Sequence, residues 1–139
     1  MNAITLAERK SRAWAMMLYV LGGVLLLSEL AGMAVVRSDF SDGFWFGVAI
    51  VCALTLLPWR RWFRPHSALS RLLDDEAVRE HRRISCAAGF WASLAAALAT
   101  APVAHDGIIT AYDTARVVAT AALFAAMVSF ATLELRAAR

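Results

Sequence analysis

The chain has 139 residues, of which 60% are hydrophobic and 18% are charged, and its net charge is +3. Soluble globular domains are roughly 45–50% apolar and about 25% charged, so this composition excludes an ordinary soluble domain. The arginines lie in short segments between long apolar blocks rather than along one face, which argues against nucleic acid as a partner despite a pI near 9.4. Because these blocks are apolar on every side, they favour lipid as their surroundings.

The first apolar block runs from Trp14 to Val36 and contains one charged residue, Glu29. Its 23 residues are enough for a helix to cross a hydrocarbon core about 30 Å thick, which needs about 20. The block is longer than the apolar region of a signal peptide, which is about 7–15 residues. We therefore expect a retained membrane span at 14–36.

The second block, 43–59, is short for a span but has tryptophan near both ends, Trp45 and Trp59. Aromatic side chains at the two membrane interfaces fix the depth of a short helix. Ser41 or Asp42 can cap the start of this helix, and Pro58 marks its end.

The third and fourth blocks, 84–104 and 111–133, are separated by a short turn that contains Gly107. The third block is rich in alanine, and small residues recur in it about every four positions: Ser85, Gly89, Ser93 and Thr100. Small side chains let helices approach closely in lipid, so we expect this helix to pack tightly within the bundle or against another protein.

Charge placement predicts the orientation of the spans. Twelve of the fourteen lysines and arginines fall in the N-terminal tail, the 60–83 segment or the C-terminal tail, whereas Arg37 and Arg116 fall on the other side. The positive-inside rule then places both termini in the cytoplasm. The predicted fold is an all-α integral membrane four-helix antiparallel bundle, a single domain over 1–139, with an amphipathic cytoplasmic loop at 60–83 between spans 2 and 3.

Glu29 is the main candidate for a functional residue, because an acid within a span is costly to insert, by about 2.5–3.5 kcal/mol at the bilayer centre. Gly22 and Gly32 share its helical face, so this face is expected to point toward the bundle. Arg116 lies at a compatible depth and is the expected interhelical ion-pair partner. Three alternatives stay open: Asp113 pairs with Arg116 along the same helix, Glu29 is neutral and hydrogen-bonded, or Glu29 is a proton or cation site.

The cytoplasmic segment contains two charged stretches. In the first, arginines and tryptophans are interleaved as expected for contact with anionic lipid headgroups: Trp59, Arg60, Arg61, Trp62 and Arg64. The second, Leu73–Arg83, begins with acids that suit a helix start and continues with arginines, so we expect it to form the cytoplasmic start of the third helix. Glu76, Glu80 and His81 do not have the spacing of a specific metal site, so we expect neither a metal nor a cofactor.

Two resemblances follow from these patterns. The acids, arginines and Gly-Phe-Trp-Ala-Ser run between Leu72 and about Leu98 resemble those of small four-span proteins of proteobacterial inner membranes, which implies that location but no activity. Tyr19, Gly22, Gly23, Glu29 and Gly32 resemble the first helix of small multidrug resistance transporters, which implies proton coupling at Glu29. The long 59–83 segment departs from that second family.

The chain has no Ser/His/Asp or Cys/His set and no phosphate-binding loop, so we expect no enzymatic activity. The leading functional hypothesis is an accessory subunit or small scaffold that acts through helix packing, with a membrane-protein partner or a second copy of itself. The alternative is an oligomeric proton- or cation-coupled transporter of a small solute that uses Glu29.

Overall fold

The computed structural model describes residues 3–34, 38–57 and 76–137. These ranges contain four helices and no strand: α1 (Ala3–Ala34), α2 (Asp39–Leu56), α5 (Glu76–His105) and α6 (Ala111–Ala137). Each helix contains a stretch that is long and apolar enough to cross a membrane: Arg12–Met33, Asp39–Leu56, Val78–His105 and Ala111–Ala137. The predicted all-α four-helix membrane fold is therefore confirmed.

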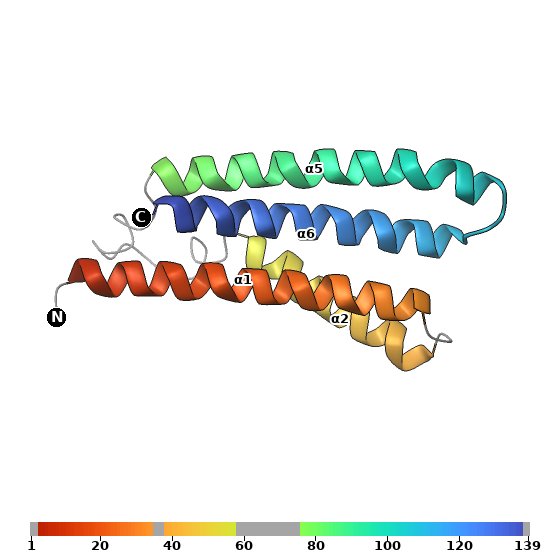
Figure 1. Ribbon diagram of the computed structural model, residues 1–139, viewed down its shortest axis with the longest axis horizontal. Coiled ribbons are helices and arrows are strands. Elements are labelled where there is room, and N and C mark those ends of the chain that lie inside the picture. The colour runs from red at the N-terminus through yellow and green to blue at the C-terminus, as the bar shows by residue number, and fades with distance from the viewer. Residues whose placement is uncertain (1–2, 35–37, 58–75, 138–139) are drawn as a thin grey trace.

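Helix α6 is the centre of the bundle, because it packs against α5, α1 and α2. Helix α1 also packs against α2, whereas α5 lies at the edge of the bundle beside α6 (Figure 1). The start of α1, the start of α5 and the end of α6 lie at one end of the bundle, and the α5–α6 turn lies at the other (Figure 1). Helices α5 and α6 are therefore antiparallel neighbours, as expected of two helices joined by a short connection.

The core is built by α1, α2 and α6, and its largest buried side chains include Leu18, Leu25 and Met127. Lipid supplies no hydrophobic driving force between helices, so close packing of the backbones matters more than apolar burial. Gly89 shows how close the approach is. A Cβ added there would lie 2.8 Å from the carbonyl oxygen of Ala122, so α5 and α6 touch at a point where only glycine fits.

Several helix boundaries differ from the predicted spans, and the largest difference is at α1, which begins at Ala3 rather than at residue 14. Helix α2 begins at Asp39, and Ser38 caps it by accepting a hydrogen bond of 3.2 Å from the amide of Ser41. The expected cap at Ser41 or Asp42 is thus wrong. The apolar block begins only at residue 43, but Asp39 and Asp42 extend the helix outward because acids in a first turn suit the helix dipole.

Helix α5 begins at Glu76, eight residues before the predicted span at 84. The expected helix start within Leu73–Arg83 is thus confirmed from Glu76 onward, and the last third of the 60–83 loop is the first part of α5. Its first turns are built of glutamate, alanine and arginine, which are good helix formers even outside the membrane. The expected lipid contacts at Trp59, Arg60, Arg61, Trp62 and Arg64 lie outside the described residues.

The turn between α5 and α6 has a well-defined local cause. Gly107 adopts a positive φ of 71°, its amide donates to Ala104, and the amide of Ile108 donates to Val103. This is a Schellman motif, in which a left-handed glycine lets two amides satisfy the last carbonyls of a helix. Thr110 and Asp113 then start α6 with reciprocal hydrogen bonds between side chains and amides, as in a capping box.

Candidate functional site

The candidate site is a group of polar side chains buried inside the membrane-spanning part of the bundle, where α1, α2 and α6 meet. Arg116 of α6 is the largest fully buried side chain, with 1% of its surface exposed. Glu29 of α1 and Thr120 of α6 are also buried. A guanidinium cannot be buried without partners, so its contacts determine what the site can do.

Glu29 and Arg116 are brought together, as the sequence led us to expect. The Nε of Arg116 donates a hydrogen bond of 3.1 Å to Oε2 of Glu29, and Nη2 lies 3.1 Å from the same oxygen. Nη2 completes no hydrogen bond of good geometry, so this contact is electrostatic rather than a second full hydrogen bond. The pair joins α1 to α6.

Gly32 makes room for this pair. A Cβ at this position would lie 3.0 Å from Nη2 of Arg116. Gly22, on the same face of α1, lies against Phe124 of α6, to which an added Cβ would come within 3.4 Å. The expected inward orientation of the face that carries Glu29 is thus what the structure shows.

Asp42 of α2 is a second carboxylate partner that sequence reasoning missed. The Nη1 of Arg116 donates a hydrogen bond to Oδ1 of Asp42, whose side chain is 32% exposed. From the sequence, Asp42 was expected to cap the second helix. Its position at the start of the second span, on the same side of the membrane as Glu29, was a signal that could have identified it.

Aromatic rings complete the surroundings of Arg116. Its Cζ lies 4.8 Å from the ring centroid of Trp45 and 5.8 Å from that of Tyr112, which are distances typical of cation–π contacts. The indole N–H of Trp45 donates a buried hydrogen bond of 3.0 Å to Thr120. Trp45 was expected at the lipid interface, but its side chain is buried against α6, where its polar atom finds a partner.

Asp113 was considered as a partner of Arg116 along the same helix, but it accepts hydrogen bonds from Thr110 at the start of α6. Its Oδ2 accepts hydrogen bonds from the amide and the hydroxyl of Thr110, at 3.2 and 2.7 Å. It therefore stabilises the start of α6, whereas the guanidinium of Arg116 donates to Glu29 and Asp42.

We call Glu29, Asp42 and Arg116 the charged triad. Its three members come from three helices, so each bond ties one helix to another. An intramembrane ion pair with buried partners is strongly coupled, because removing one member leaves the others uncompensated in a medium of low dielectric constant. The most direct consequence of this arrangement is that it holds α1 and α2 against α6.

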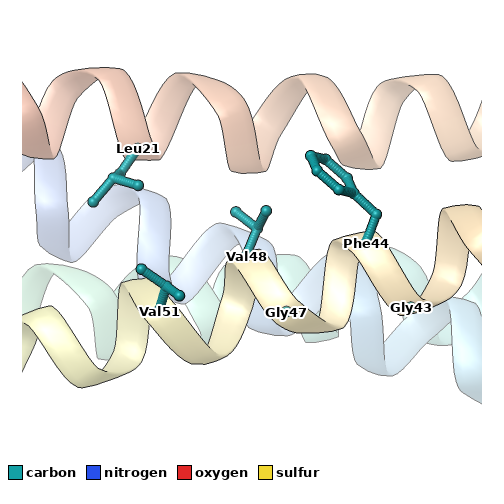
Figure 2. A pocket seen from close by; sticks show the side chains of 6 residues that line it. All are labelled: Leu21, Gly43, Phe44, Gly47, Val48 and Val51. Atoms are coloured by element: carbon teal, nitrogen blue, oxygen red, sulfur yellow. The ribbon is translucent and has the colours of Figure 1, made fainter.

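An apolar pocket lies between α1 and α2 (Figure 2). Its volume is about 310 Å³, and it is lined by Leu21, Gly43, Phe44, Gly47, Val48 and Val51. None of these residues is charged or carries a polar side chain, so the pocket provides no ligand for an ion or a polar solute. Within the described ranges, no group of three or more His, Cys, Asp or Glu side chains is placed to hold a metal ion.

A polar contact between α5 and α6 lies at the end of the bundle opposite to the charged triad. Nδ1 of His81 lies 3.2 Å from Oε1 of Glu134, and both side chains are largely buried. His81 was considered above only as a metal ligand, and its contact with Glu134 was not predicted. The two are 53 residues apart in sequence, and only the register of the α5–α6 hairpin brings them together.

No protein-family model matches the chain, and comparisons with curated proteins and with solved structures likewise find no match.

Proposed function

We propose that this chain is a non-enzymatic multi-pass protein of a bacterial inner membrane that acts through helix packing, as an accessory subunit or small scaffold. The observation that carries this proposal is the engagement of Arg116. Its guanidinium is 1% exposed, donates to two carboxylates from two other helices and lies against two aromatic rings. The intramembrane charges are thus used to hold the bundle together.

The outward surfaces support the same proposal. Large apolar side chains of α5 face away from the bundle, among them Ile84, Trp91 and Leu98. The charged side chains of Glu29 and Arg116 are turned inward. A partner in the membrane would therefore meet an apolar helix surface. Association in lipid through such surfaces depends on shape and close packing.

The proposed orientation has both termini in the cytoplasm. In the described part of the chain, the end that carries the start of α1 and the end of α6 also carries Arg9, Arg12 and Arg136. The opposite end carries Asp39, Asp42, Asp106 and Asp113. This asymmetry, together with the count of twelve against two in the whole sequence, supports a cytoplasmic location for the basic end.

The proposal is tested by photo-crosslinking in native membranes. A photoreactive amino acid is placed on the outward face of α5, at Trp91 or at Leu98, and as a control at Ala126 of α6, which is buried. Capture of the same second protein, or of a second copy, from both outward positions but not from the control is the expected result. Capture of lipid alone at every outward position would contradict the proposal.

The rival transport function is distinguished by Glu29→Gln. If the triad is structural, this variant loses thermal stability, and reconstituted vesicles show no proton or solute flux with either protein. A flux that is present with the native chain and abolished by Glu29→Gln, with folding unchanged, would replace the packing proposal by the transport one.

A further inference from the structure

Helix α5 has two sides of different character. One side packs against α6, where Ser85 and Gly89 are buried. On the opposite side, Arg79, Arg83, Phe90 and Leu94 are exposed. Their spacings of four, seven and four residues place them on one helical face. We call these four residues the outer stripe of α5.

The first half of the outer stripe is basic and lies at the start of the membrane-crossing stretch. The membrane-crossing stretch of α5 begins at Val78, and Arg79 and Arg83 lie within its first two turns. Arg83 contacts Glu80 at 3.9 Å, but the two side chains are 84% and 56% exposed. An ion pair this long and this exposed contributes little and does not prevent the guanidinium from binding another anion.

The second half of the outer stripe is apolar. Phe90 is 61% exposed and Leu94 is 39% exposed, and the neighbouring Trp91 is 65% exposed. Phe90 follows Arg83 by seven residues, which is about 10 Å along a helix that rises about 1.5 Å per residue. This separation matches the step from the phosphate level of a bilayer to its acyl chains.

We propose that the outer stripe of α5 binds an anionic phospholipid, with its phosphate between Arg79 and Arg83 and one acyl chain along Phe90 and Leu94. Charge complementarity supplies the first part of the argument, because two guanidinium groups one turn apart suit a phosphate. The continuity of the basic and apolar halves on one face supplies the second. A free phosphate would use only the arginines, whereas a phospholipid uses the whole stripe.

This inference rests on the membrane location of the chain and not on the proposed packing function, so the two fail separately. Loss of lipid selectivity leaves capture of a partner protein untouched, and the reverse also holds.

The test uses Trp91 as a reporter beside the stripe. The full-length protein is placed in vesicles that contain either phosphatidylglycerol or phosphatidylcholine with brominated acyl chains, which quench tryptophan on contact. The difference between the protein and its Trp91→Phe variant isolates the signal of this residue from those of the other four tryptophans. The measured quantity is the ratio of the apparent affinities for the anionic and the zwitterionic lipid.

The variants are Arg79→Gln with Arg83→Gln, and as a matched control Arg9→Gln with Arg136→Gln, which removes the same charge from the same end of the bundle. Each arginine near an anionic surface contributes about fivefold to binding, so the first double variant should lower the selectivity by up to about 30-fold. The control should change it by less than about threefold. Circular dichroism and the melting temperature of each variant confirm that the fold is kept.

Three results would overturn the inference. The first is a native protein without preference for the anionic lipid at Trp91, and the second is an equal loss of selectivity in both double variants. The third is full competition by inorganic phosphate, which would show that the arginines bind a free anion rather than a lipid.

Discussion

Removing the cation of the charged triad should destabilise the protein more than any other single change to a polar side chain. In Arg116→Met the apolar stem of the side chain is largely kept, but Glu29 loses its partner while it stays buried. Breaking a buried pair in this way costs about 3–5 kcal/mol. Asp42 adds little to this cost, because its side chain is 32% exposed and can be hydrated once α2 loosens.

A second substitution separates this mechanism from simple loss of packing. Adding Glu29→Met to Arg116→Met removes the uncompensated charge, and apolar replacements of a whole buried pair are often neutral or stabilising. We therefore expect the double variant to recover most of the loss and to lie within about 2 kcal/mol of the native protein. The single Glu29→Gln variant should be intermediate, at about 1–3 kcal/mol, because Arg116 keeps its bond to Asp42.

The assay is reversible unfolding by sodium dodecyl sulfate in mixed micelles, followed by circular dichroism, with the native protein and the three variants measured under the same conditions. A loss below about 1 kcal/mol for Arg116→Met would refute the reasoning, since it is the size of an ordinary interhelical hydrogen bond in a membrane. A double variant that is as unstable as Arg116→Met would refute it as well, because the defect would then be steric.

Three further outcomes are expected. Gly89→Ala should lower the free energy of unfolding by about 1–3 kcal/mol, because its methyl group would lie 2.8 Å from the carbonyl oxygen of Ala122. In the same unfolding assay Gly23→Ala should be neutral or stabilising, because an added Cβ there has nothing within 4 Å. Trp45→Phe should cost about 0.6 kcal/mol beyond its lost packing, as typical of one interhelical hydrogen bond in lipid, and a Thr120→Val background should remove that part of the effect. A fluorescent protein fused after Arg139 should be fluorescent in bacterial cells, and alkaline phosphatase fused at the same place should be inactive. The opposite pair of results would contradict a cytoplasmic C-terminus.

The fold could be predicted to a large extent because lipid is a demanding solvent. In a bilayer every backbone polar group must be satisfied within its own segment, so a long apolar block has few structures open to it. The four spans follow from this constraint. The helix ends follow less well, because the cap at Ser38 and the start of α1 at Ala3 depend on local capping and helix propensity outside the apolar blocks.

The site was predicted in part for the same reason. An isolated acid and an isolated arginine at similar depth in different spans have a strong reason to meet, and Glu29 and Arg116 do so. Asp42 was missed because an acid at a helix start already has a local explanation. The contact between His81 and Glu134 was missed because the rotation and register of two packed helices are set by tertiary packing, here by the close approach at Gly89, and not by either helix alone.

The measurement that tests the account most directly is native mass spectrometry of the full-length protein, extracted gently from its membrane together with the surrounding lipid. If the chain acts through helix packing, it should leave the membrane in a reproducible complex, with a second protein or a second copy at fixed stoichiometry. A monomer that carries only lipid, from several independent extractions and at native expression level, would contradict that claim.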